Sequence, residues 1–272
     1  MSISPRLDVP ARRTTSQQHG GSSQLERNPD QQLWRWGGAA GLAGGILLIG
    51  SGVAVGALGL PDASDVETLT DFADIESGRI AEHFLYLGAL VLFALHVLVL
   101  QRLLQTAHRA AALFGAAVAE FGLLIMAASS LLHVSTSPLA DLYNDPGTSP
   151  EDLRSIEYAW HGAQSVFDTM LATGVLLVPI GIVLLGIAMR STPAFGSRLA
   201  MLAIVLGAVG IIGAAIAVID PGSMFSAISV LAIVVFHLST GWRTLKLGSE
   251  TSSELSIDAS IDRDDRQTTA AD

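Results

Sequence analysis

The chain has no cysteine among its 272 residues, and charged residues make up only 15% of it. The absence of cysteine excludes disulfide scaffolds, cysteine-ligated zinc, iron–sulfur clusters and thiol nucleophiles. The shortage of charge separates this sequence from soluble domains, in which about a quarter of the residues are charged. Basic residues are especially few, 15 against 25 acidic ones, and the resulting net charge of -10 argues against a nucleic-acid partner.

Half of the residues are hydrophobic, and most of them are gathered in six blocks that contain almost no charge. The blocks cover residues 33–60, 81–104, 111–134, 158–189, 199–219 and 223–245. Each block is long enough to form a helix that crosses a ~30 Å hydrocarbon layer, which takes ~20 residues. Their sequences do not alternate between polar and apolar residues as barrel strands do. The sequence therefore predicts an all-α polytopic membrane helix bundle with six transmembrane helices, and a lipid bilayer as its main partner.

Two polar segments flank the apolar blocks. Residues 1–32 are rich in Ser, Gln, Gly and Arg, and residues 248–272 carry many more carboxylates than arginines. Segments with few large apolar side chains cannot bury enough surface to fold, so they remain disordered. We therefore predict a disordered N-terminal tail over residues 1–32, a six-helix transmembrane domain over 33–247, and a disordered acidic C-terminal tail over 248–272.

The basic residues near the blocks are distributed unevenly along the chain. They flank alternate ends of the blocks, at Arg27, Arg35, Arg102, Arg109, Arg190, Arg198, Arg243 and Lys246. The two longer loops, residues 61–80 and 135–157, are acidic instead. Because cytoplasmic loops of membrane proteins carry an excess of Lys and Arg, the sequence predicts a multi-pass protein of the plasma membrane with both termini in the cytoplasm.

The two acidic loops also contain helix signals. In the first loop, apolar residues recur every three positions at Val66, Leu69, Phe72 and Ile75. This spacing predicts a short helix that lies on the membrane surface. In the second loop, Ser149 followed by Pro150 has the pattern of an N-cap and a first helical residue, so we expect the fourth spanning helix to begin there.

Glycines line one face of two of the blocks. They stand at Gly37, Gly41 and Gly45 in the first block and at Gly207, Gly210 and Gly213 in the fifth. Small residues at this spacing let helix backbones approach closely in lipid, where little hydrophobic drive acts between helices. These faces suit packing within the chain, and they equally suit a homo-oligomer or another membrane partner.

Ionisable groups within the blocks are candidates for function, because each costs at least ~2.5 kcal/mol in a hydrocarbon layer. At a rise of ~1.5 Å per residue they sort into two layers. The predicted outer polar cluster, near the outer leaflet, comprises His83, His133, His161 and Asp168. The predicted inner polar layer, about 12 Å from the cytoplasmic boundary, comprises His96, Glu120 and His237.

Four interpretations of these layers remain open. Each side chain can hydrogen-bond a neighbouring helix and serve packing alone. The outer polar cluster is a set of three histidines and one carboxylate that suits zinc, which could activate water in a membrane hydrolase. His96 with His237, or two outer histidines, could ligate b-type haem in a redox protein. Glu120, His96 and Asp168 could line a pathway for protons or a small solute. The sequence assigns neither a cofactor nor a reaction.

The second half of the chain carries one further pattern. In order, it contains His161, Asp168, Val178-Pro179-Ile180-Gly181, Met189-Arg190-Ser191, Pro193, Gly207 and Gly210. Over residues 158–213 the sequence resembles the family catalogued as domain of unknown function 4386, which consists of multi-pass membrane proteins of prokaryotes. The resemblance implies a fold and a membrane location, and it brings no established activity to His161 or Asp168.

Overall fold

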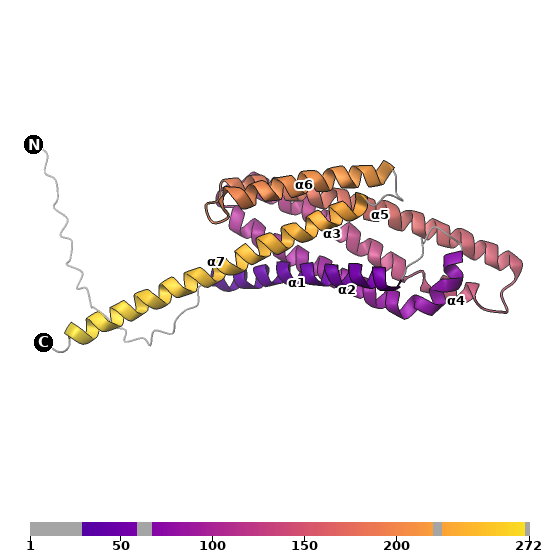
Figure 1. Cartoon of the computed structure of the whole chain (residues 1–272), viewed down its shortest axis with the longest axis horizontal. Coiled ribbons are helices and arrows are strands. Elements are labelled where there is room, and N and C mark those ends of the chain that lie inside the picture. Colours follow the sequence, from indigo (N-terminus) through magenta and orange to yellow (C-terminus); the bar gives the residue numbers. More distant parts are fainter. Residues whose placement is uncertain (1–28, 59–66, 220–224, 270–272) are drawn as a thin grey trace, which may run out of the picture.

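The computed structural model describes residues 29–58, 67–219 and 225–269 of the chain, and its regular elements there are all α-helices. The helices are α1 (Pro29–Leu58), α2 (Glu67–Leu104), α3 (Arg109–Val134), α4 (Ser137–Tyr143), α5 (Pro150–Arg190), α6 (Gly196–Ile219) and α7 (Phe225–Thr269). All except α4 contain a stretch long and apolar enough to cross a membrane. The predicted all-α architecture with six helices able to span a membrane is confirmed for the described residues (Figure 1).

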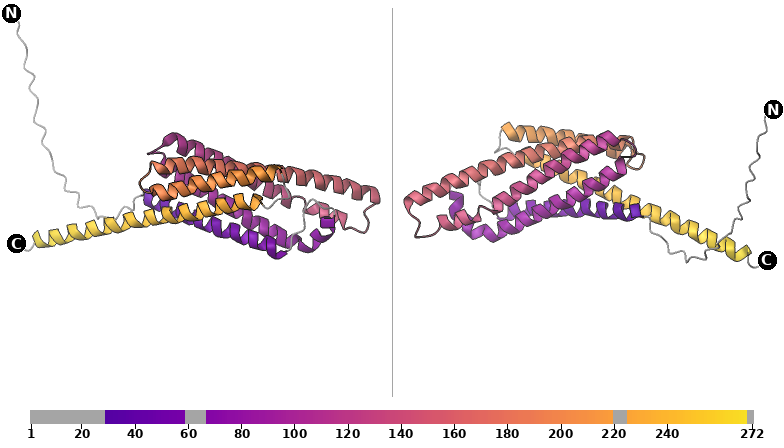
Figure 2. Two further views of the ribbon diagram at one scale, coloured as in Figure 1. Left: turned by 45° about the horizontal axis from the view of Figure 1, so that its top comes forward. Right: turned by 180° about the vertical axis from the view of Figure 1, so that it is seen from behind.

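The six long helices run side by side along the long axis of the molecule and close into a ring (Figure 2). Around this ring α1 packs on α2, α2 on α3, α3 on α5, α5 on α6, α6 on α7, and α7 back on α1. Across the ring, α5 touches α7, and α2 touches both. The start of α1 and the extension of α7 lie at the same end of the bundle, as an even number of crossings requires (Figure 1).

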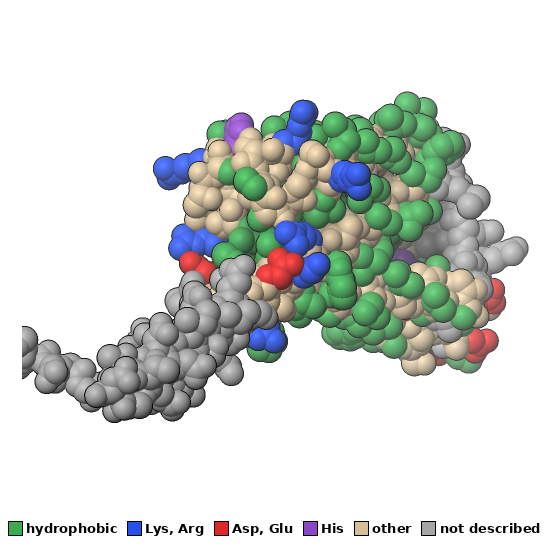
Figure 3. Space-filling model, turned by 60° about the vertical axis from the view of Figure 1, so that its left-hand side comes forward, with side chains coloured by type: hydrophobic (Ala, Val, Ile, Leu, Met, Phe, Trp, Pro, Cys, Tyr) green, Lys and Arg blue, Asp and Glu red, His purple; other side chains and the backbone are tan. Residues whose placement is uncertain are grey.

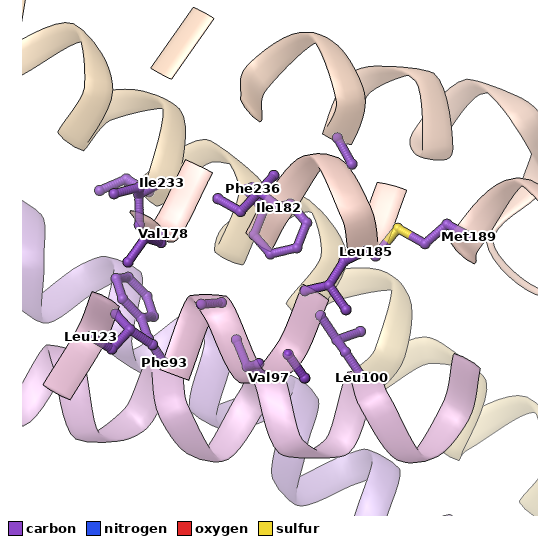
Figure 4. Close-up of a cluster of buried hydrophobic side chains, with 14 of the residues drawn as sticks. Phe93, Val97, Leu100, Leu123, Val178, Ile182, Leu185, Met189, Ile233 and Phe236 are labelled. Atoms are coloured by element: carbon purple, nitrogen blue, oxygen red, sulfur yellow. The ribbon is translucent and has the colours of Figure 1, made fainter. Parts of the chain in front are cut away.

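Large apolar side chains fill the interior of the ring where α2, α5 and α7 meet (Figure 4). Phe93 and Val97 come from α2, Val178 and Ile182 from α5, and Phe236 from α7, and all five are buried. In a bilayer this burial gives little hydrophobic free energy, because the hydrocarbon outside the bundle is as apolar as its core. Close van der Waals contact must therefore hold the helices together.

Glycines make the closest contacts between helices. A Cβ on Gly41 of α1 would lie 2.7 Å from the Nδ1 of His96 on α2, and a Cβ on Gly45 would lie 2.5 Å from Leu238 on α7. A Cβ on Gly207 of α6 would lie 2.8 Å from a backbone oxygen of α5. Both predicted glycine faces thus serve packing within the chain, and their use in a homo-oligomer stays a prediction.

Besides α7, which has 45 residues, two of the long helices are much longer than a membrane crossing. Helix α2 has 38 residues and α5 has 41, whereas about 20 suffice for the hydrocarbon layer. At the end of the bundle opposite to the α7 extension, their outer turns pack with α4 (Figure 1). A second apolar cluster holds them together, made of Leu69, Phe72, Ala140, Ile156 and Trp160. We call this part, residues 67–81, 137–143 and 150–169, the cap.

The cap corrects the expectation of a short surface helix over residues 66–75. Helix α2 runs unbroken from Glu67 to Leu104, so these residues are its first turns and not a separate helix. Leu69 and Phe72 are buried against α4 and α5, where they contact protein instead of lipid. The first residue of the expected helix, Val66, lies outside the described residues.

The helix boundaries follow the sequence signals at α5 and differ from them at the two tails. As expected, α5 begins at Pro150, and the Ser149 hydroxyl oxygen accepts a hydrogen bond of 3.2 Å from the Asp152 backbone N–H. Helix α1 begins at Pro29, within the segment 1–32 that we expect to be disordered, and residues 1–28 lie outside the described ones. Helix α7 continues to Thr269, so the segment expected to be disordered from 248 onward is helical up to that residue.

Side chains on the surface divide by type along the long axis. Lys and Arg gather at the end from which α7 extends, while the sides are largely hydrophobic (Figure 3). The helix ends there carry Arg102, Arg109, Arg190 and Arg198, and Lys246 lies within α7. Exposed apolar side chains on the sides include Ile46, Val53, Leu98, Phe121, Leu124 and Ile212. A belt of apolar side chains between polar ends is the surface that a bilayer favours.

Candidate functional site: a buried polar cluster beneath the cap

Polar side chains meet where the cap joins the bundle. His83 on α2 and His133 on α3 have only 8% and 2% of their surface exposed. Their rings stack with centroids 4.7 Å apart and planes 16° from parallel. The structure thus brings together two of the four residues of the predicted outer polar cluster. With their partners they form a group that we call the subcap cluster, which consists of Ser51, Arg79, Glu82, His83 and His133.

His83 donates a hydrogen bond within this cluster. Its Nδ1 lies 2.6 Å from Glu82 Oε2 and 3.0 Å from the backbone oxygen of Arg79. Because a carboxylate and a carbonyl oxygen can only accept, Nδ1 carries the ring hydrogen. The other carboxylate oxygen, Glu82 Oε1, accepts a hydrogen bond of 2.5 Å from the Ser51 hydroxyl of α1. Each oxygen of Glu82 therefore has its own donor, although the side chain is buried.

His133 accepts a hydrogen bond from a guanidinium. Arg79 Nη2 is in contact with His133 Nε2. A guanidinium has donors and no acceptor, so His133 Nε2 must accept and the hydrogen of the neutral ring is on Nδ1. Among the described residues, neither His133 Nδ1 nor Arg79 Nε has a hydrogen-bond partner, and both atoms are buried.

Aromatic side chains enclose the His133 ring. Phe167 of α5 lies 4.7 Å from it between ring centroids, and Phe72 and Trp160 each lie 6.5 Å away. Phe72 and Trp160 also meet edge to face at 5.5 Å, a favoured geometry for aromatic pairs. The guanidinium of Arg79 stands 5.9 Å from the centre of the Phe72 ring, within the range of a cation–π interaction. These rings cover the subcap cluster from the cap side and limit its access to water.

Further buried polar atoms near this site lack a hydrogen-bond partner within the described part of the chain. They are Gln164 Nε2, Ser137 Oγ and Tyr86 OH. Gln164 lies on the face of α5 that bears the aromatic rings, and Ser137 follows His133 by about one helical turn. All three can donate hydrogen bonds. A buried donor left unsatisfied costs about 1–3 kcal/mol, so these atoms are candidates to bind water or a solute.

The other two residues of the predicted outer polar cluster lie on a different face of α5. Trp160 and Phe167 face the His133 ring, and His161 and Asp168 each follow one of them directly in the sequence. One residue turns a helix by about 100°, so His161 and Asp168 are exposed on its outer surface. Within residues 29–58, 67–219 and 225–269, no three His, Asp or Glu side chains are grouped so that they could hold a metal ion. The proposed zinc ligand set is therefore not assembled in this structure.

The inner layer contains a direct contact between two histidines. His96 of α2 and His237 of α7 are fully buried, and their Nδ1 atoms lie 2.9 Å apart, so one donates and the other accepts. Phe93 stacks on the His237 ring with centroids 3.7 Å apart. The two rings hydrogen-bond each other directly, so a haem held between them would have to replace this contact. An inner haem stays a prediction.

Glu120 does not join that histidine pair. It lies on α3, which packs on α2 and α5, whereas the histidines connect α2 with α7. Its buried Oε1 has no hydrogen-bond partner among the residues that the structure describes. No hydrogen bond joins Glu120 to His96 within the described part of the chain. A proton or solute pathway along Glu120, His96 and Asp168 stays a prediction.

Three residues of the subcap cluster, Ser51, Arg79 and Glu82, are missing from the predicted site, and the last two belong to α2. The predicted span begins at residue 81, which puts both at its edge, whereas α2 begins at Glu67 and carries them well inside the helix. Arg79, Glu82, His83 and Tyr86 follow one another at the spacing of a single helix face, and this spacing is the signal that identifies them. No protein-family model, curated protein or solved structure matches this chain. The chemistry of the subcap cluster must therefore be inferred from its own contacts.

Proposed function

We propose that the chain is a multi-pass protein of the plasma membrane with both termini in the cytoplasm. The six long apolar helices support a location in a bilayer. Lys and Arg gather at the end that holds the start of α1 and the extension of α7 (Figure 3), and exposed carboxylates such as Asp71, Asp145 and Glu151 lie at the cap end. Because positive charge is retained on the cytoplasmic side, the cap faces the outside of the cell.

The absence of cysteine makes this orientation simple to test, because single cysteines can be labelled without background. Asp145→Cys at the cap end and Ser197→Cys at the basic end change exposed positions. In intact cells we expect a membrane-impermeant maleimide to label position 145, and to label position 197 only after lysis. The reverse pattern would give the opposite orientation, and equal labelling of both positions in intact cells would contradict a spanning topology.

We further propose that the subcap cluster binds a small solute that accepts hydrogen bonds and enters from the outside. The observation that carries this proposal is the buried contact between Arg79 and His133, which leaves Arg79 Nε and His133 Nδ1 as donors without a partner in the described residues. Glu82 does not satisfy them, because its oxygens accept from His83 and Ser51 and form no hydrogen bond with either of these two atoms. The donors therefore require an acceptor that the described side chains do not provide.

A small oxyanion is the simplest solute that fits these donors. The Arg79 guanidinium carries a permanent positive charge and forms charge-assisted hydrogen bonds with carboxylate or phosphate oxygens. The aromatic cover lowers the local dielectric constant, which strengthens this attraction. His133 and Gln164 then add neutral donors of fixed direction. In this arrangement His83 and Glu82 act as positioning residues. The His83 ring stacks on His133 and its Nδ1 bonds to the backbone oxygen of Arg79, while Glu82 fixes the His83 ring by accepting from the same nitrogen.

Thermal unfolding of the purified protein in detergent tests the binding proposal. Acetate and inorganic phosphate are the probes, compared with chloride at the same ionic strength. A ligand at about 100 times its Kd stabilises the folded state by about 2.7 kcal/mol, so we expect at least one probe to raise the melting temperature. Arg79→Gln should abolish the effect, whereas His161→Ala, at an exposed histidine outside the cluster, should retain it. If neither probe stabilises the wild type, or if Arg79→Gln responds as strongly, the oxyanion proposal is wrong.

The remaining alternatives can be tested on the same preparation. Stoichiometric zinc in the purified protein would support a metal-dependent membrane hydrolase, and a Soret band would support a b-type haem redox protein. Membership in the family catalogued as domain of unknown function 4386 is likewise a proposal, and the six-helix layout supports it.

A further inference from the structure

A pocket opens at the basic end of the bundle, far from the subcap cluster. It has a volume of about 220 Å³ and is lined by Asp30, Trp34, Arg102, Leu103, Gln105 and Thr106. The first two belong to the first turns of α1, and the other four to the end of α2 and the segment that follows it. The pocket therefore lies where two neighbouring helices of the ring reach their common end.

Charge and aromatic residues put this pocket at the level of lipid headgroups. Arg102 is in the last turn of α2, at the end of its apolar stretch. Two tryptophans near the same end are largely exposed, Trp36 on α1 with 69% of its surface and Trp242 on α7 with 64%. Tryptophan is enriched where hydrocarbon meets headgroups. A headgroup of the inner leaflet is therefore the solute nearest to the pocket.

We propose that this pocket binds a zwitterionic phosphate ester, supplied by the headgroup of a phosphatidylethanolamine-type lipid. Arg102 presents a guanidinium to the phosphate, and Gln105 and Thr106 can donate to its other oxygens. Asp30 supplies negative charge for the ammonium group. The Trp34 ring offers that ammonium group a second, cation–π contact.

The balance of charge in the lining favours a zwitterion over an anion. Among the described residues that line the pocket, Arg102 and Asp30 are the ionised ones, and their formal charges cancel. A purely anionic headgroup would gain the attraction of Arg102 but also meet the repulsion of Asp30, whereas a zwitterion meets an opposite charge at both of its ends. Leu103 adds an apolar contact at which the glycerol and acyl chains can leave toward the hydrocarbon.

Lipid retention measures this selectivity directly. The purified, delipidated protein is given equal amounts of phosphatidylethanolamine and phosphatidylglycerol in detergent, and the retained lipids are counted by native mass spectrometry. We expect the wild type to prefer phosphatidylethanolamine. Arg102→Gln should weaken retention of both lipids about tenfold, the change that ~1.4 kcal/mol produces. Asp30→Asn should remove the preference while phosphatidylglycerol is still retained. Arg109→Gln is the matched control, because this exposed arginine lies close by but does not line the pocket.

Soluble phosphoethanolamine distinguishes the two sources of this chemistry. Displacement of the lipid only at a large excess of phosphoethanolamine would support a membrane lipid as the ligand. Displacement at equal concentration would support the same recognition of a phosphate ester from the cytoplasm. Equal retention of the two lipids by the wild type would overturn the proposal, as would Arg102→Gln behaving like Arg109→Gln.

Discussion

Glu82 accepts hydrogen bonds from two side chains of the subcap cluster. Its two oxygens accept from Ser51 and His83, and its carboxylate is the negative charge nearest to Arg79 in the cluster. In Glu82→Ala both donors lose their acceptor, and the guanidinium loses its counter-charge. Each buried donor left unsatisfied costs about 1–3 kcal/mol. With two donors affected, we expect the free energy of unfolding in detergent micelles to fall by about 3 kcal/mol, measured by denaturant titration with circular dichroism.

Two further variants test whether this loss of stability comes from the hydrogen bonds of Glu82. Asp74→Ala removes an exposed carboxylate from the same helix and should change stability by no more than about 0.5 kcal/mol. Glu82→Gln keeps one acceptor oxygen and should lie between the two. If Glu82→Ala were as stable as Asp74→Ala, the hydrogen bonds of the subcap cluster would contribute nothing to the fold.

The hydrogen bond between His96 and His237 gives a second prediction at the scale of single residues. His96→Leu leaves the remaining Nδ1 without its partner, and so does His237→Leu. The double variant removes both polar groups together. Its loss of stability should therefore be smaller than the sum of the single losses by about 1 kcal/mol, the size of hydrogen bonds measured between membrane helices. Denaturant titration of the four proteins gives this coupling, and strict additivity would contradict the bond.

How far the site could be predicted depends on the residue. His83 and His133 could be grouped from the sequence, because both lie near the same end of consecutive helices. His161 could not be separated from Trp160 in this way, because both belong to one helix and the packing of that helix decides which side is buried. Helical periodicity fixes the angle between two neighbouring side chains, and only contacts with other helices fix which of them faces inward.

At the scale of helices, the contact between α3 and α5 gives the next prediction. A Cβ on Gly181 would lie 2.6 Å from the Ala119 backbone nitrogen and 2.6 Å from the Gly115 backbone oxygen. Backbone atoms cannot move aside as the end of a side chain can, so Gly181→Ala must push the two helices apart. Such overpacking costs about 1–3 kcal/mol, and we expect a lower melting temperature in detergent.

Gly52→Ala provides the control for this prediction. A Cβ at Gly52 on α1 meets nothing within 4 Å, and alanine is the better helix former by about 1 kcal/mol. This variant should therefore be as stable as the wild type or more stable. If both variants lost the same stability, the loss in Gly181→Ala would not come from the close approach of α3 and α5, and the prediction would be wrong.

The helices themselves were the most predictable part of the fold, and their lengths were less so. Six apolar blocks define six spanning segments, because a bilayer demands about 20 apolar residues from each. The polar turns that extend α2 and α5 into the cap look like loops by composition. Leu69 and Phe72 carry a helical pattern, but an apolar stripe suits a membrane surface and a protein neighbour equally well. Their contact with Trp160 shows that the neighbour is protein. Because this contact joins segments far apart in the sequence, the local pattern does not reveal it.

At the scale of the whole molecule, the closed ring separates two polar regions. The subcap cluster lies at the cap end and the headgroup pocket at the basic end, with the apolar core of the ring between them. His83 and Arg102 lie 19 residues apart on α2, or about 28 Å. This is nearly the ~30 Å thickness of a hydrocarbon layer. The two proposed sites therefore face opposite leaflets, and a variant in one should leave binding at the other unchanged.

The depth of the molecule in the bilayer is the last prediction, and its four tryptophans can report it. Trp160 is fully buried in the cap, whereas Trp242 is 64% exposed at the basic end. Trp160 also lies about 45 Å from Arg190 along α5, well beyond the ~30 Å of hydrocarbon that starts near that arginine. We compare variants that keep one tryptophan, with the other three changed to Phe, in vesicles of lipids brominated on the acyl chains. Bromine quenches the fluorescence of rings that it contacts, so the variant with Trp242 should be strongly quenched and the variant with Trp160 hardly at all. Strong quenching of Trp160 would put the cap within the hydrocarbon, where a solute from outside could not reach the subcap cluster through water.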